Sequence, residues 1–167
     1  RFTNLKSELI DTLTEENLKK TTRKMISKAQ VTVDILIRNL YERTADVGFL
    51  ATDHEICSFL QQPVSGYDEI MLIRKRLQEY VAKYSVYEEI VIIDNDRVVR
   101  ANLDPDNEIL GHVIDDEIID RTIASDRDFE ESFQPSVLLT KRANAHVFSR
   151  RIYRPSTNEV LGTIYLF

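Results

Sequence analysis

The sequence predicts an α+β domain in which a five-stranded antiparallel sheet follows a long N-terminal helix. Two observations carry this prediction. Residues 1–47 contain neither Gly nor Pro, which is typical of a continuous helix. After residue 85 the apolar pattern changes from a helical period to short strand-like runs. Helices followed by a series of strands indicate a sheet with flanking helices, which we expect on one face of the sheet.

The N-terminal helix carries a narrow apolar seam with steps of 4, 3, 4, 4, 3 and 4 residues, formed by Leu18, Thr22, Met25, Ala29, Val33, Leu36 and Leu40. A small domain cannot bury so long a seam. We therefore predict that residues 1 to about 30 pair with a helix of a second subunit, in a homodimer. The alternative is that the seam packs only on its own domain.

Two further helices are expected before the sheet. The stretch "VGFLATDHEICSFLQQP" continues as helix, with a break near Gly48 or at Thr52-Asp53, where Asp53 can cap a new turn. The stretch "YDEIMLIRKRLQEYVAKYS" has a helical apolar face. We accordingly predict a helical dimerisation and signal region at residues 1–62 and a ligand-sensing module at residues 63–167.

The predicted strands are "EEIVIIDND", "RVVRANL", "FEESFQ", "AHVFSRRIY" and "EVLGTIYLF", with weak helical patches in the acidic stretch between the second and third. The cluster Asp94-Asn95-Asp96 stands between the first two. We interpret it as a hairpin turn, because Arg97 and two valines stand where a calcium loop would need oxygen ligands and a glycine.

Composition limits the possible functions. The net charge of −6 argues against nucleic acid as the main partner, and a single cysteine, Cys57, allows no internal disulfide and no cysteine-rich zinc site. We expect neither a metal nor a cofactor. The sequence has no phosphate-binding glycine loop and no hydrolase motif, and its three histidines are far apart, so we predict that the chain is not an enzyme. No apolar run is long enough to span a bilayer, and no signal peptide is visible; we expect a fragment of a longer protein.

Four features together resemble the extracytoplasmic Cache sensor domains of bacterial chemoreceptors, sensor histidine kinases and diguanylate cyclases. They are the long first helix, "LATDHEICSFL", the hairpin "YEEIVIIDNDRVVRAN" and the closing "RRIYRPSTNEVLGTIYLF". The resemblance implies a PAS-like sheet, and a periplasmic or extracellular sensor that binds a small molecule and belongs to a membrane receptor of chemotaxis or two-component signalling. The alternatives are a cytoplasmic PAS-type or GAF-type interaction module and a free-standing binding protein.

Charge and strand alternation give candidate ligand-binding residues. An acidic stretch at residues 104–131 precedes a basic one with Lys141, Arg142, Arg150, Arg151 and Arg154. An arginine facing the pocket would hold a carboxylate through two parallel hydrogen bonds, whereas the alternative is a set of exposed ion pairs. On "AHVFSRRIY" one face holds His146, Phe148 and Arg150 together with Ile152. We predict Arg150 as the first ligand contact, with the further candidates His146, Phe148, Thr163, Tyr165 and Arg121.

The chain also departs from the amino-acid-binding members of the resembling family. Those members typically hold the ligand amine with an Asp on the last strand and pack the ligand against Tyr and Trp. Here there is no Trp, and Phe167 stands about where that Asp would fall. The predicted ligand is therefore a small carboxylate, or another uncharged or anionic metabolite.

Overall fold

The computed structural model describes residues 2–63, 65–84, 86–141 and 143–167, so Arg142 of the basic stretch lies outside the described residues. The chain forms two compact units, Arg1–Glu42 and Arg43–Phe167. Helix α1 (Phe2–Ala51) supplies all the described part of the first unit and the beginning of the second. The boundary between the compact units lies at residues 42–43. Residues 43–62 belong to the sheet-containing unit, so this boundary stands twenty residues before the functional boundary that the sequence suggested.

Asp53 separates α1 from the next helix, as the sequence predicted. Its carboxylate accepts hydrogen bonds from the backbone N–H groups of Glu55 and Ile56, at 3.0 and 3.2 Å, and so caps the first turn of α2 (His54–Leu60). Arg76 of α3 (Tyr67–Tyr84) donates to the same carboxylate. One acidic residue therefore fixes the junction of three helices.

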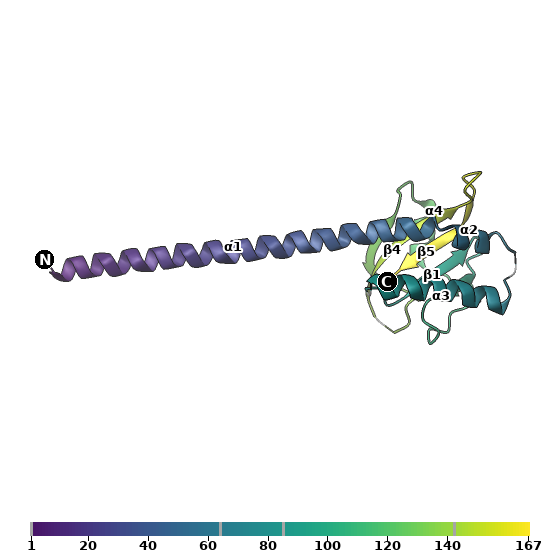
Figure 1. Cartoon of the computed structure of the whole chain (residues 1–167), viewed down its shortest axis with the longest axis horizontal. Coiled ribbons are helices and arrows are strands. Elements are labelled where there is room, and N and C mark those ends of the chain that lie inside the picture. The colour runs from purple at the N-terminus through teal and green to yellow at the C-terminus, as the bar shows by residue number, and fades with distance from the viewer. Residues whose placement is uncertain (1, 64, 85, 142) are drawn as a thin grey trace. The chain divides into compact units, whose positions relative to one another are not determined.

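The sheet has five antiparallel strands in the order β2-β1-β5-β4-β3, which confirms the predicted fold class. Figure 1 shows the sheet with α2 and α3 beside it. The strands are β1 (Ile90–Asp94), β2 (Val99–Asn102), β3 (Glu130–Gln134), β4 (Ala145–Tyr153) and β5 (Val160–Leu166). The helical patch in the acidic stretch forms α4 (Glu117–Ala124), capped by Asp116.

Both faces of the sheet are covered, whereas the sequence predicted helices on one face only. Helices α2 and α3 contact β5 and β2, and the end of α1 meets Arg150 of β4 at Gly48. Helix α4 contacts β3, β4 and β5 from the other side. This explains why four consecutive residues of β1, from Ile90 to Ile93, are all fully buried. We call the two sides the helical face and the α4 face.

The register decides which side chains share a face. Ile164 of β5 pairs with Ile92 and with Arg150, which places Arg150 on the helical face. One position earlier on β5, Thr163 pairs with Ile93 and with Arg151, so Arg151 lies on the α4 face.

The segment Asp94-Asn95-Asp96 is a turn, as predicted. One carboxylate oxygen of Asp94 accepts hydrogen bonds from the backbone N–H groups of Asp96 and Val98, both at 3.0 Å, and the other accepts one from Arg100 at 3.2 Å. Arg97 takes the left-handed backbone conformation, with φ 63°, that closes the turn. The acidic side chain at the start of this turn is thus used to hold the hairpin together.

Candidate ligand-binding site

Four hydroxyl side chains lie buried among apolar residues on the α4 face. We call them the hydroxyl cluster; each is at most 2% exposed, and they are Thr122, Ser149, Thr163 and Tyr165. They come from α4, β4 and β5, three elements that are distant in sequence and meet only in the folded sheet. A polar group in an apolar interior is costly unless it has a hydrogen-bond partner.

The hydroxyls satisfy one another. Thr122 and Ser149 are joined by a hydrogen bond of 2.7 Å, and the phenol of Tyr165 donates to Thr163 at 2.9 Å. Burial raises the pKa of the Tyr165 phenol above its ordinary value, and the hydroxyls of Thr163 and Thr122 oppose this only in part. The phenol therefore stays protonated and neutral at physiological pH, able to donate a hydrogen bond.

Three arginines lie on α4 or beside it on this side of the unit. Arg151 stands beside Thr163 across the β4–β5 pair and donates to the carbonyl of Ile123 at 3.5 Å. Arg121 lies 3.6 Å from the carboxylate of Glu130, and its buried Nε atom makes no hydrogen bond among the described residues. Arg97 binds the carboxylates of Asp115 and Asp120. Of the three, Arg151 is the one that the strand register places beside the hydroxyl cluster, as the partner of Thr163.

An apolar layer covers the rest of the α4 face. Ile118 and Ile119 of α4, together with Leu138 and Leu139 of a loop, pack into the same core as Tyr165. We call this loop, Ser136–Lys141, the strap. Asp116 holds the first two residues of the strap. Its carboxylate accepts hydrogen bonds from the Ser136 hydroxyl at 2.7 Å and from the Val137 N–H at 3.0 Å.

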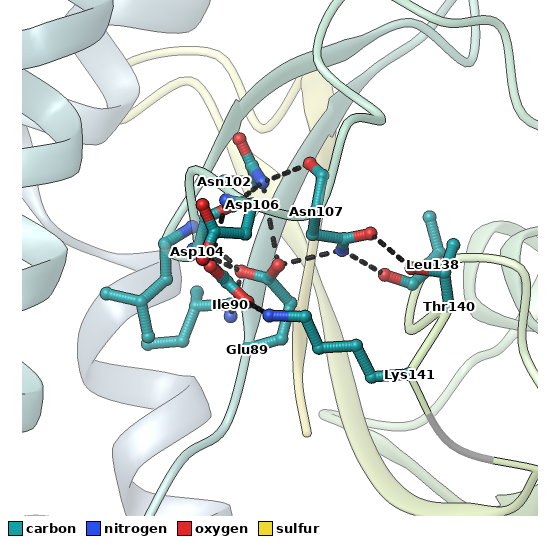
Figure 2. Close-up of polar contacts among 10 residues, drawn as sticks. Glu89, Ile90, Asn102, Asp104, Asp106, Asn107, Leu138, Thr140 and Lys141 are labelled. Carbon is teal, nitrogen blue, oxygen red and sulfur yellow. Dashed lines mark hydrogen bonds and ion pairs between the residues drawn. The ribbon is translucent and has the colours of Figure 1, made fainter.

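The far end of the strap is tied to a buried carboxylate, as Figure 2 shows. Asn107 donates to the carbonyl of Leu138 at 2.8 Å and accepts from the Thr140 hydroxyl at 3.0 Å. The same Asn107 amide donates to Glu89, also at 2.8 Å. Glu89 is fully buried and accepts in addition from the backbone N–H groups of Ile90, Leu103 and Asp104.

The environment of Glu89 has two opposing effects on its charge. Burial raises the pKa of the Glu89 carboxyl above its usual range, while the hydrogen bonds from Asn107 and three backbone N–H groups lower it. At the edge of this network Lys141 binds the carboxylate of Asp104 and holds its pKa below the ordinary value. These contacts link the strap to β1 and to the loop after β2.

The structure does not bring the six predicted site residues together. Thr163 and Tyr165 lie on the α4 face, in the hydroxyl cluster, and Arg121 lies on α4 itself. Arg150, Phe148 and His146 lie on the helical face, because they alternate with Ser149 and Arg151 along β4.

The three residues on the helical face have partners there. A terminal nitrogen of Arg150 lies only 2.9 Å from where a Cβ atom at Gly48 would stand, and the same side chain is 3.9 Å from Asp128. His146 lies 2.7 Å from the carboxylate of Glu131, and its ring contacts that of Phe148. Arg150 thus lies against the end of α1, on the face of the sheet opposite to Thr163 and Tyr165.

Sequence reasoning missed three residues of the α4 face: Thr122, Ser149 and Arg151. The alternation along β4 placed Ser149 and Arg151 together, but it could not show that this pair faces Thr163 and Tyr165. Thr122 had a weak signal, since it lies on the buried side of α4 together with Ile118 and Ile119.

A separate groove of about 310 Å³ lies between the end of α1 and α3, lined by residues that include Asp46, Phe49, Arg76 and Tyr80. The rings of Phe49 and Tyr80 stack at 5.6 Å. The acidic side chains are already engaged, because Asp46 accepts from the phenols of Tyr80 and Tyr87 and Asp53 binds Arg76. These contacts stabilise the packing of the helices, and we assign no ligand to the groove.

Within the described ranges, no three or more His, Cys, Asp or Glu side chains come close enough to hold a metal ion. The helices described there also lack the combination of length and hydropathy needed to cross a bilayer. Cys57 is buried, and burial raises the pKa of its thiol.

The fold of this chain, a five-stranded antiparallel sheet preceded by a long helix, is similar to that of solved sensor domains. Among solved structures, the chain is similar to the sensor domain of the histidine kinase DctB of V. cholerae, with a TM-score of 0.67 and 14% identity over 86% of this chain and 55% of that one. It is also similar to the DcuS sensor domain of E. coli, with a TM-score of 0.57 and 19% identity over 77% of this chain and 87% of that one. A domain of a putative sensory box/GGDEF family protein from Vibrio parahaemolyticus gives a TM-score of 0.56 and 12% identity, over 78% of this chain and 52% of that one.

These similarities confirm the predicted resemblance at the level of the fold. The chain spans about half the length of two of the three matched structures. No protein-family model matches the sequence, and no curated protein matches it significantly. The matched structures are described as sensor domains or as part of a sensory-box protein.

Proposed function

We propose that this chain is the extracytoplasmic, Cache-type sensor domain of a membrane receptor, and that it binds a small metabolite on the α4 face of its sheet. One observation carries the proposal. A cluster of mutually bonded hydroxyls, Thr122, Ser149, Thr163 and Tyr165, is buried under a helix and a strap that are fastened by a few polar contacts. When a ligand binds to this face, hydrogen bonds between the hydroxyls are replaced by hydrogen bonds from the hydroxyls to the ligand.

A small carboxylate suits this face best. A desolvated carboxylate needs donors on both oxygens and a positive charge nearby, and an arginine provides two parallel donors in one planar group. Arg151 stands directly beside Thr163, and the Nε atom of Arg121, which is paired with Glu130 at 3.6 Å, makes no hydrogen bond among the described residues. Of these two, Arg121 was a sequence prediction, whereas Arg151 replaces Arg150 as the preferred cation because of its face.

Signalling requires that the ligand bind one arrangement of the domain better than another, since equal affinity for two arrangements shifts nothing. The elements that cover the cluster differ in how they are held. Helix α4 reaches β4 through the Thr122–Ser149 contact, and the strap is tied to Asp116 and Asn107. We propose that ligand binding changes these contacts and that the receptor acts as a homodimer joined through α1.

A thermal-shift screen of residues 1–167 against small carboxylates, amino acids, amines and purines tests the proposal. A ligand at about 100 times its Kd adds roughly 2.7 kcal/mol to the stability of the folded state. We expect a dose-dependent rise with small carboxylates that Arg151→Ala abolishes and Arg150→Ala preserves. The two variants remove the same charged group from neighbouring residues on opposite faces, so each is the control for the other.

The other outcomes are distinct. A rise that is lost in Arg150→Ala and kept in Arg151→Ala would move the site to the helical face, where His146 and Phe148 also lie, and would restore the site predicted from the sequence. The absence of a shift with every compound would contradict ligand binding and favour an interaction module instead.

A further inference from the structure

The two oxygens of the buried Glu89 carboxylate have different kinds of partner. Oε1 accepts hydrogen bonds at 2.8 to 3.0 Å from three backbone N–H groups, those of Ile90, Leu103 and Asp104. In the described part of the chain, Oε2 accepts only from side-chain amides, that of Asn107 at 2.8 Å and that of Asn102 at 3.5 Å. A backbone N–H group cannot turn into an acceptor, so a proton that binds this carboxyl group binds Oε2.

The two amides beside Oε2 differ in their freedom to respond to that proton. Arg74 of α3 donates to the side-chain oxygen of Asn102 at 2.8 Å and to its backbone carbonyl at 2.9 Å. Because arginine has donors only, the Asn102 amide keeps its orientation. The side-chain oxygen of Asn107 instead accepts from the Thr140 hydroxyl at 3.0 Å. A hydroxyl can also accept, so the Asn107 amide can turn over, exchanging its oxygen and nitrogen, and still keep Thr140 as a partner.

Turning the Asn107 amide over reverses its contact with the strap. In the closed arrangement of Figure 2, its nitrogen donates both to Glu89 and to the carbonyl of Leu138, at 2.8 Å each. After the turn its oxygen accepts the hydrogen of the protonated Glu89 carboxyl, but the same oxygen then faces the Leu138 carbonyl. Two acceptors with no hydrogen between them repel each other. The strap thus loses its hold at Leu138, which packs in the same core as Tyr165.

Charged side chains face the Glu89 carboxylate from three other elements. They are Arg74 of α3, which reaches it through Asn102, Asp104 and Asp106 of the loop after β2, and Lys141 of the strap. The positive charge of Lys141 favours the ionised form of Glu89. Burial acts in the opposite direction and raises the pKa of the Glu89 carboxyl above its usual range. Glu89 therefore takes up its proton at a higher pH than an exposed glutamate does.

We propose that Glu89 is a proton-sensitive latch for the strap: when its carboxyl group is protonated, Asn107 turns over, Leu138 is released and the strap swings away about its other attachment, at Asp116. The closed strap gives the ionised carboxylate a donor that the open arrangement lacks. The open arrangement therefore binds the proton more tightly, and acidification favours it. The inference rests on the proposed function in placing the ligand under the strap, and it adds that mild acidification opens that site.

Two measurements on residues 1–167 without ligand test the latch, from about pH 8 to about pH 4. A carboxyl-carbon NMR titration follows Glu89, Asp104 and Asp116 separately, and amide hydrogen exchange follows the strap. Once Glu89 is protonated, we expect the Leu138 and Leu139 amides to exchange about tenfold faster, after correction for the intrinsic effect of pH on exchange. The midpoint of this change should coincide with that of the Glu89 carboxyl.

Two substitutions sharpen the test. Lys141→Met removes a positive charge beside Glu89 at an exposed position, so the midpoints of the Glu89 carboxyl and of the strap amides should move together to higher pH. Lys6→Met in α1 is the control and should move neither. Glu89→Gln carries a permanently neutral group, so its strap amides should exchange fast at every pH. Where Glu89→Gln is too unstable to fold, Lys141→Met alone decides.

Three results would overturn the latch. They are unchanged strap protection while Glu89 titrates, a strap midpoint that follows the carboxyl of Asp104 or Asp116 instead, and a strap midpoint that stays in place when Lys141→Met moves that of Glu89. Loss of protection at the Val137 N–H, which Asp116 binds, with the same midpoint would overturn the attachment about which the strap swings. None of these results depends on a ligand, so a failure here is distinguishable from a failure of the thermal-shift test.

Discussion

The hydroxyl oxygens of Thr122 and Ser149 lie 2.7 Å apart and join α4 to β4 inside the sheet-containing unit. The bond has a direction that the surrounding contacts fix. The Thr122 hydroxyl already donates to the carbonyl of Ile118 at 2.6 Å, so Ser149 is the donor in the shared bond. The Ser149 hydroxyl therefore needs Thr122 as its hydrogen-bond acceptor, whereas the Thr122 hydroxyl has a backbone acceptor of its own.

We expect the two single substitutions at this pair to have unequal effects. Thr122→Val leaves the Ser149 hydroxyl buried without an acceptor and should lower the free energy of unfolding by about 1–3 kcal/mol. Ser149→Ala leaves Thr122 bonded to the backbone and should cost only about 0.5–1 kcal/mol. Urea denaturation measures both, and the double variant should cost no more than Thr122→Val alone. Additive losses would contradict the direction that we assign to the bond.

Gly162 and Gly48 give a second contrast between matched substitutions. A Cβ atom at Gly162 would lie 2.2 Å from the carbonyl oxygen of Ile93, a backbone atom that cannot move without distorting β1. A Cβ atom at Gly48 would meet only the mobile end of Arg150, and alanine also favours the helix by roughly 1 kcal/mol over glycine. We predict that Gly162→Ala lowers the free energy of unfolding by about 3 kcal/mol or more, whereas Gly48→Ala leaves it unchanged or raises it. Thermal denaturation of the two variants side by side checks this, and a well-folded Gly162→Ala protein would contradict it.

The elements of the fold could be predicted because their signals are local. Each of these signals depends on residues that are close in the sequence, as in the helical seam, the cap at Asp53, the turn at Asp94 and the strand patterns. The candidate site could not be predicted in the same way. Strand alternation separates Arg150 from Arg151, but the pairing between β4 and β5 decides which of them faces α4. A shift of one residue in that pairing exchanges the two faces.

The burial of Glu89 could not be predicted from the local sequence either. The stretch "YEEIVI" gives no reason to distinguish Glu89 from its neighbour Glu88, yet Glu89 is fully buried and Glu88 is exposed. The difference comes from residues far along the chain. Asn107 and the backbone N–H groups of Leu103 and Asp104 converge on the Glu89 carboxylate only after the loop behind β2 has folded over the start of β1.

Glu89→Gln should therefore be strongly destabilising. The contacts described for this carboxylate are all with N–H donors, so a glutamine amide would turn its own N–H₂ group towards some of them. We expect a loss on the order of 3 kcal/mol in the free energy of unfolding at neutral pH. The control is Glu108→Gln, the same change at an exposed position beside Asn107, which should stay within about 0.5 kcal/mol of the wild type. Equal stability of the two variants would show that the network is not needed for folding.

The contact between Lys141 and Asp104 predicts that the pKa of the Asp104 carboxyl depends on Lys141, the last residue of the strap. Lys141 lowers the pKa of the Asp104 carboxyl in the folded protein, so this carboxylate favours folding above its unfolded pKa and loses that contribution as the pH falls through its folded pKa. Lys141→Met removes the charge and keeps the side-chain length. The pKa of Asp104 should then rise towards its ordinary value, and the stability of the variant should fall less than that of the wild type on acidification. An NMR titration of the Asp104 carboxyl carbon measures the shift directly, with Lys6→Met in α1 as the control. An unchanged Asp104 pKa in Lys141→Met would mean that the backbone N–H of Asp106, which also binds this carboxylate at 2.9 Å, sets its charge instead.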